Sequence, residues 1–62
     1  MKSAEVIRRL SKEGWECVRI KGSHHHFKHP SIEGLVTVPH PKSEIPLPTL
    51  RSIYKQAQWP WR

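Results

Sequence analysis

The stretch WECVRIKGSHHHFKHP (residues 15–30) predicts two strands joined by a tight turn. Residues 15–21 have the β-branched and aromatic content of a strand, and residues 24–29 form a second extended segment that a proline ends. Gly22 and Ser23 between them supply the turn. Because the connection is so short, the two strands are expected to pair in antiparallel fashion.

The residues before this hairpin predict a helix. Val6, Ile7 and Leu10 fall on one helical face, and Ser3 is a residue type that caps a helix start. Gly14 then supplies the left-handed conformation that ends a helix.

The residues after the hairpin predict a third strand and a second helix. The third strand is LVTV at residues 35–38. Four of the six prolines lie in residues 39–48, which excludes a helix there and requires an extended crossing. In residues 49–58 the apolar side chains recur at i, i+3, i+4 and i+7, as an amphipathic helix requires; they are Leu50, Ile53, Tyr54 and Ala57.

The element order is therefore α-β-β-β-α, which predicts an α+β fold. Two helices are expected to cover one face of a three-stranded antiparallel sheet and to leave the other face open. This layout resembles the double-stranded RNA-binding (dsRBD-like) fold. A chain of 62 residues is expected to form one small domain over residues 1–62, with a modest core.

Composition narrows the class of partner and the compartment. The net charge of +6 favours a polyanionic partner, nucleic acid first, with an acidic protein as the alternative. No apolar stretch is long enough for a membrane span or resembles a signal peptide. The single cysteine, Cys17, cannot close a disulfide within the chain and is expected to be a small packed hydrophobe. We therefore expect a cytoplasmic protein without membrane contact.

Four of the five histidines lie in the second strand segment, where alternation divides them between two faces. Phe27 is the residue expected to point into the core, and a bulge at the Gly-Ser turn would disturb the alternation near it. The side chains expected on the same face as Phe27 are His25, which should be incompletely buried, and His29. Those expected on the open face are His24, His26 and Lys28.

Metal binding is the minor interpretation of these histidines. His24 and His26 share a strand face, and His29 or His40 would have to supply a third ligand. No cysteine or carboxylate stands at a matching spacing, so we expect no metal site. The run GSHHH also resembles a purification tag, but tags lie at chain ends and this run is internal.

Catalysis is the stronger interpretation. An imidazole with a pKa of about 6.5 exchanges protons near neutral pH, which suits general acid or base catalysis of phosphodiester cleavage. RNA supplies its own nucleophile, and Lys21, Lys28 and Arg19 are near enough in sequence to stabilise charge on the phosphate. A non-catalytic module that only binds RNA on the same fold is the alternative.

Two long segments resemble a known family. MKSAEVIRRLSKEGWECVRIKGSHHHFKHP (residues 1–30) and GLVTVPHPKSEIPLPTLRSIYKQA (residues 34–57) are similar to HicA toxins, also called the YcfA-like family. The most specific elements are GSHH after the first strand, HP at the end of the second, VTVPHP on the third and TLRSIYKQA on the last helix.

The resemblance implies a function and a site. It implies a dsRBD-like toxin that cleaves mRNA as a metal-independent endoribonuclease, needs no cofactor and is neutralised by a HicB antitoxin that covers the active site. The family's catalytic histidine corresponds to His24 or His25, and both stay candidates. The expected RNA contacts are Gly22, Ser23, Lys21, His26, Lys28 and Arg19.

The chain departs from the family at its end. Members commonly have a glycine soon after KQA, whereas this chain continues QWPWR. Trp59 and Trp61 around Pro60 can pack on the helices, stack on bases or contact the antitoxin, and packing within the chain is the default expectation.

Overall fold

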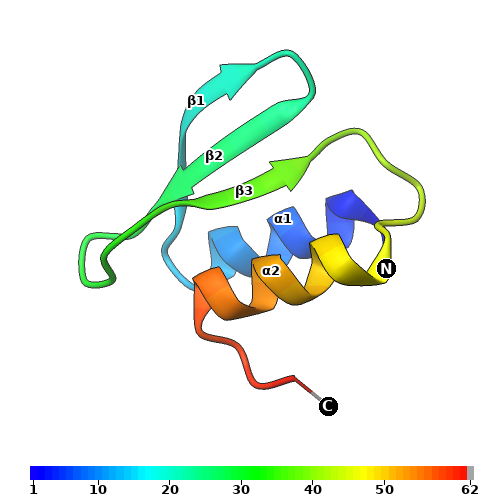
Figure 1. Cartoon of the computed structure of the whole chain (residues 1–62). Helices are drawn as coiled ribbons and strands as arrows, with labels where there is room; N and C mark the ends of the chain where they lie inside the picture. Colours follow the sequence, from blue (N-terminus) through cyan, green and yellow to red (C-terminus); the bar gives the residue numbers. More distant parts are fainter. Residues whose placement is uncertain (62) are drawn as a thin grey trace.

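A computed structural model describes residues 1–61, and it contains the five predicted elements in the predicted order. They are α1 (Ser3–Lys12), β1 (Glu16–Lys21), β2 (His24–Lys28), β3 (Val36–Pro39) and α2 (Leu47–Ala57). The strands form one antiparallel sheet in the order β1-β2-β3, and both helices lie on one side of it (Figure 1). The predicted α+β architecture is confirmed.

The core lies between the helices and the strands β2 and β3. Alternation along both strands sends every second side chain inward, where the apolar stripes of α1 and α2 cover them. Trp15, Ile45 and Trp59 also belong to the core, although they lie outside the helices and strands. The buried apolar side chains are Val6, Leu10, Trp15, Phe27, Val36, Val38, Ile45, Leu50, Ile53, Ala57 and Trp59.

The start of α1 differs from the prediction. Lys2 is the N-cap residue, and its amide donates to the Glu5 carboxylate at 3.0 Å. Ser3 is inside the first turn and is buried, so the expectation that it caps the helix is wrong. Its hydroxyl instead accepts a hydrogen bond from the Lys42 amide at 2.9 Å, which ties α1 to the proline-rich crossing.

The hairpin has the predicted turn but not the anticipated bulge. Gly22 has a φ of +59° as the first central residue of the two-residue turn, a position where type II′ turns favour glycine. The irregularity lies between Cys17 and Arg19, well inside β1. One extra residue there reverses the alternation of β1, so Arg19 and Lys21 face the same side as their partners on β2.

Strand β1 lies outside the layer that the helices cover (Figure 1). All six of its residues are exposed, including Val18 at 56% and Ile20 at 61%. Cys17 is exposed as well, so the expectation of a packed cysteine is wrong. The physical reason is the width of the helical layer. Two helices side by side are wide enough to cover β2 and β3 only, so β1 is exposed to solvent.

The remaining differences are shifts of element ends. Strand β3 begins at Val36, the partner of Phe27, and includes Pro39 at the sheet edge. Helix α2 begins at Leu47, two residues before the predicted start, because Pro48 fits the first turn, where a missing N–H costs nothing. Gln58 ends α2 in the left-handed conformation, and Trp59 then folds back on the helices and is buried, as expected, whereas Trp61 stays 41% exposed.

Candidate functional site

The open face of the sheet gathers basic side chains from two strands. Lys21 is paired with His24 across β1 and β2, and Arg19 is paired with His26. Directly opposite residues point to the same side of a sheet, so these four share the face that the helices leave uncovered, together with Lys28. We call this set the open face: Arg19, Lys21, His24, His26 and Lys28.

In the described part of the chain the cations of the open face form no salt bridge with a carboxylate, although Glu16 lies directly opposite Lys28 on the same face. Within residues 1–61 the ion pairs join the N-terminal ammonium to Glu44 and Arg9 to Glu13. Arg19, Lys21 and Lys28 are exposed and take part in neither. Unpaired cations on one face are suited to phosphate groups, which they can bind without first breaking a salt bridge.

His24 lies at the end of the open face and lines a groove. The groove has a volume of about 370 Å³ and runs between the free edge of β3 and the exposed side of α2. The Gln56 side chain accepts a hydrogen bond from the Thr37 amide at 3.1 Å, which satisfies this part of the strand edge. The other polar side chains that line the groove are Lys42, Thr49 and Ser52.

His25 points to the opposite side, toward the core, and is half-buried. Its ring packs edge-to-face on His40, with centroids 5.0 Å apart. His40 in turn places Nδ1 2.8 Å from the buried hydroxyl of Ser3. The neighbours of His25 are therefore protein groups at the start of α1, and only its partly exposed part can meet a ligand.

The other histidines have hydrogen-bond partners within the protein. His26 Nδ1 lies 2.9 Å from the Thr37 hydroxyl, which fixes the ring on the open face. His29 Nε2 donates to the Glu13 carbonyl at 2.9 Å, and its Nδ1 accepts from the Ser31 amide at 3.0 Å. His29 thereby joins the end of β2 to the loop after α1, where it also packs on Trp15.

The register of β1 and β2 brings Arg19 and Lys21 beside His26 and His24, whereas Lys28 lies opposite Glu16 at the far end of the strand pair. Gly22 and Ser23 form the turn next to His24, and the Ser23 carbonyl accepts a hydrogen bond from the His40 amide at 2.8 Å.

Over residues 1–61, no group of three or more His, Cys, Asp or Glu side chains is placed to hold a metal ion.

The sequence did not predict the residues that line the groove opposite His24. Lys42, Thr49, Ser52 and Gln56 reach His24 from the crossing and from α2, at least eighteen residues away in the chain. Their positions follow from the pairing of β3 and from the docking of α2 on it. Only the exposed polar side of α2, visible in its periodicity, could have pointed to them.

No helix in the described part of the chain is both long and apolar enough to cross a membrane.

Comparison with known proteins identifies the family. A search of curated proteins found no match. The family model described as "HicA toxin of bacterial toxin-antitoxin" matches residues 3–59, which include both helices, the whole sheet and the buried Trp59. The chain therefore belongs to the HicA toxin family of bacterial toxin–antitoxin systems.

Proposed function

We propose that this toxin is a metal-independent endoribonuclease that cleaves mRNA and is neutralised by a HicB antitoxin. The observation that carries the proposal is the position of His24, which lies exposed on the open face, paired with Lys21 and beside the groove along β3. A titratable imidazole next to unpaired cations is the minimum that cleavage of RNA requires.

The chemistry needs no group from outside the chain and its substrate. A neutral histidine takes the proton from a ribose 2′-hydroxyl, and the 2′-oxygen forms a bond to the adjacent phosphorus. The bond from phosphorus to the 5′-oxygen breaks, which leaves a 2′,3′-cyclic phosphate and a 5′-hydroxyl whose proton comes from a protonated imidazole or from water. Lys21 and Arg19, the cations nearest to His24, stabilise the charge that develops on the phosphate, and Lys28, four residues further along β2, is proposed to hold another phosphate of the RNA.

Either His24 or His25 is proposed as the catalytic histidine, and each has its own support. His24 has the exposure and the cationic neighbours that a group acting on phosphate needs. His25 follows it directly, is half-buried and is held against His40, which gives it a defined orientation. The exposure of His24 supports it as the group nearest the substrate backbone, whereas His25 lies on the opposite side of β2, toward the core.

Cleavage of a labelled single-stranded RNA in EDTA tests the proposal. His24→Ala and His25→Ala each replace one candidate, and loss of the catalytic imidazole is expected to reduce kcat by about 10²- to 10⁴-fold while RNA binding persists. His26→Ala is the matched control on the same strand, expected to weaken binding and to keep kcat. Intact RNA at high wild-type concentration, with normal cell growth on expression, would favour the non-catalytic RNA-binding module instead.

The antitoxin is tested by titration. The charge of +6 and the uncovered open face suit an acidic partner, for which HicB is proposed. Cleavage is expected to fall as HicB is added, with an association rate that decreases strongly with salt. RNA cleavage that stays constant at a molar excess of HicB would reject this partner.

A further inference from the structure

The C-terminal tail folds back on the side of the helices that faces away from the sheet (Figure 1). The Trp59 amide donates to the Tyr54 carbonyl at 2.8 Å, which reverses the chain after α2. Trp59 is buried at 7% exposure, whereas Trp61 keeps 41% of its surface exposed. The two tryptophans of the tail therefore have different environments, and only Trp59 is accounted for by the core.

The exposed ring of Trp61 is held in place by other aromatic rings. Tyr54 packs edge-to-face on Trp59 at 5.1 Å and on Trp61 at 5.0 Å between centroids. The guanidinium of Arg9 covers Trp59 at 4.0 Å and so fixes the inner end of this stack. Trp61 is thus a large aromatic surface that is already oriented before any ligand arrives, which lowers the entropy cost of binding.

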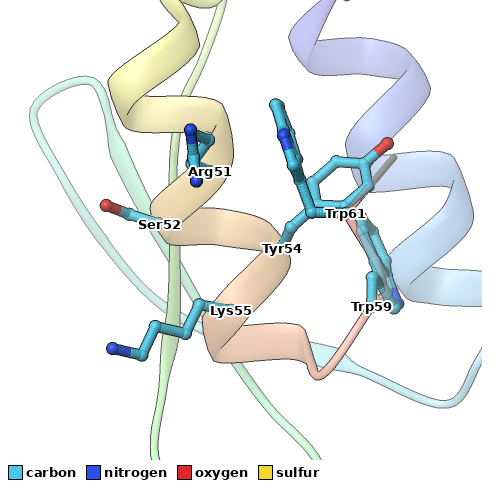
Figure 2. A pocket seen from close by; sticks show the side chains of 6 residues that line it. All are labelled: Arg51, Ser52, Tyr54, Lys55, Trp59 and Trp61. Carbon is cyan, nitrogen blue, oxygen red and sulfur yellow. The ribbon is translucent and has the colours of Figure 1, made fainter.

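Cations adjoin this surface. The Arg51 guanidinium lies over one face of the Trp61 ring, 5.4 Å from its centroid, and Lys55 follows one turn later on α2. Neither forms an ion pair within residues 1–61. Figure 2 shows Ser52 and Lys55 on one side of α2, the aromatic rings on the other and Arg51 between them. These side chains line a hollow of about 390 Å³.

The hollow and the groove at His24 lie close to each other on the protein surface. Ser52 lines both, so both border the exposed side of α2. An α-helix with its side chains is about 10–12 Å across, a distance that a short length of extended RNA covers. A strand lying in the His24 groove can therefore pass over α2 at Ser52 and reach Trp61 without leaving the protein surface.

We propose that the Trp61 hollow is a second RNA-binding site, which stacks one base of the single strand whose cleaved segment lies on the open face. The inference rests on the proposed function, since it takes the substrate to be single-stranded RNA. Exposed aromatic rings bind bases of any sequence by stacking, and adjacent cations hold the phosphates. Arg51 and Lys55 supply the cations and Trp61 the ring.

Binding of RNAs of increasing length tests the site. The protein carries both His24→Ala and His25→Ala, so that RNA stays intact, and oligonucleotides are lengthened one nucleotide at a time in an anisotropy assay. Affinity is expected to rise about tenfold at the length that reaches Trp61, because one additional base stacks. Trp61→Ala should remove this rise and Trp61→Phe should keep it. Leu35→Ala, which truncates another exposed apolar side chain, is the matched control.

The outcomes separate this inference from the proposed function. The same length dependence in Trp61→Ala and in its parent would overturn the second site, and wild-type cleavage of short RNA would then leave the nuclease standing. A length-dependent rise without any cleavage by the wild type would retain the site and reject the nuclease. Weaker HicB binding by Trp61→Ala with unchanged RNA binding would assign the tail to the antitoxin and also overturn the inference.

Discussion

The two faces of β2 differ in both burial and charge. On one face Phe27 is 3% exposed and packs among the helices. On the other, His24 and Lys28 are exposed among unpaired cations. Burial in the core and exposure to solvent thus fall on opposite faces of one five-residue strand. Substitutions one position apart should therefore produce different kinds of defect.

The largest expected effect is on the covered face. Phe27→Ala removes the central ring of the core and should lower the free energy of unfolding by about 3–5 kcal/mol. A domain of this length has only about 3–9 kcal/mol in total, so this single substitution should remove a large fraction of the stability. Urea denaturation followed by circular dichroism measures this. Lys28→Ala, on the open face, should stay within about 0.5 kcal/mol of wild type; equal midpoints for the two variants would contradict the comparison.

A smaller effect is expected at the margin of the core. Trp59 Nε1 donates to the Glu13 carboxylate at 2.7 Å. Trp59→Phe keeps most of the ring and removes this donor, which should lower the free energy of unfolding by about 1.5 kcal/mol, since the acceptor is charged. Thermal unfolding of this variant beside Trp61→Phe measures the difference. A larger loss in Trp61→Phe would show that the exposed tryptophan, and not the buried one, stabilises the fold.

On the open face the expected change is in RNA binding alone. Arg19→Gln and Lys21→Gln should leave the free energy of unfolding within about 0.5 kcal/mol of wild type. Each should reduce the slope of log affinity against log salt by about 0.7 if that residue contacts a phosphate. Arg8→Gln, an exposed cation on α1, is the control and should leave the slope unchanged. An equal reduction in Arg8→Gln would indicate general attraction instead of a defined face.

The smallest expected effect is on the pH dependence of stability. Burial raises the pKa of Glu13, but hydrogen bonds from Trp59 and Arg9, with the charges of Arg9 and His29, outweigh it and hold the pKa below its ordinary value of 4.5. The stabilisation is therefore present above the ordinary value and is lost as pH falls through the lower folded-state pKa. Glu13→Gln should flatten the urea midpoint over this acidic range. An unchanged acid dependence would show that other carboxylates set it.

What the sequence predicts well here is local. The two-residue period of residues 24–28 identifies Phe27 as a core residue, and the Gly22 turn follows from the need for a positive φ. Both depend on neighbours in the chain. The same period assigns His24 and His26 to the open face, as the register of the sheet confirms.

What the sequence does not predict depends on packing between distant segments. Val18, Cys17 and Ile20 look like core residues, yet the helices do not extend over β1, and nothing in a strand pattern reports the width of a helical layer. Ser3 is a residue type that often caps a helix, but here it is buried and its hydroxyl is hydrogen-bonded to His40. Lys42 and the other groove residues reach His24 only after the crossing has folded over the sheet edge.

The exposed β1 strand has a consequence for solubility. Its outer edge has no strand partner in the sheet, and Val18 and Ile20 beside it are apolar, a combination that favours edge-to-edge association between copies. Arg19 and Lys21 alternate with them and keep like-charged edges apart. We infer that the cations proposed to hold RNA also protect the free protein from self-association, which light scattering over a salt series would detect as growing particle size. A particle size that stays constant at high salt would show that these charges do not prevent self-association. A polyanion that neutralises Arg19 and Lys21 must then also cover the outer edge of β1, because otherwise the complex would self-associate through that edge.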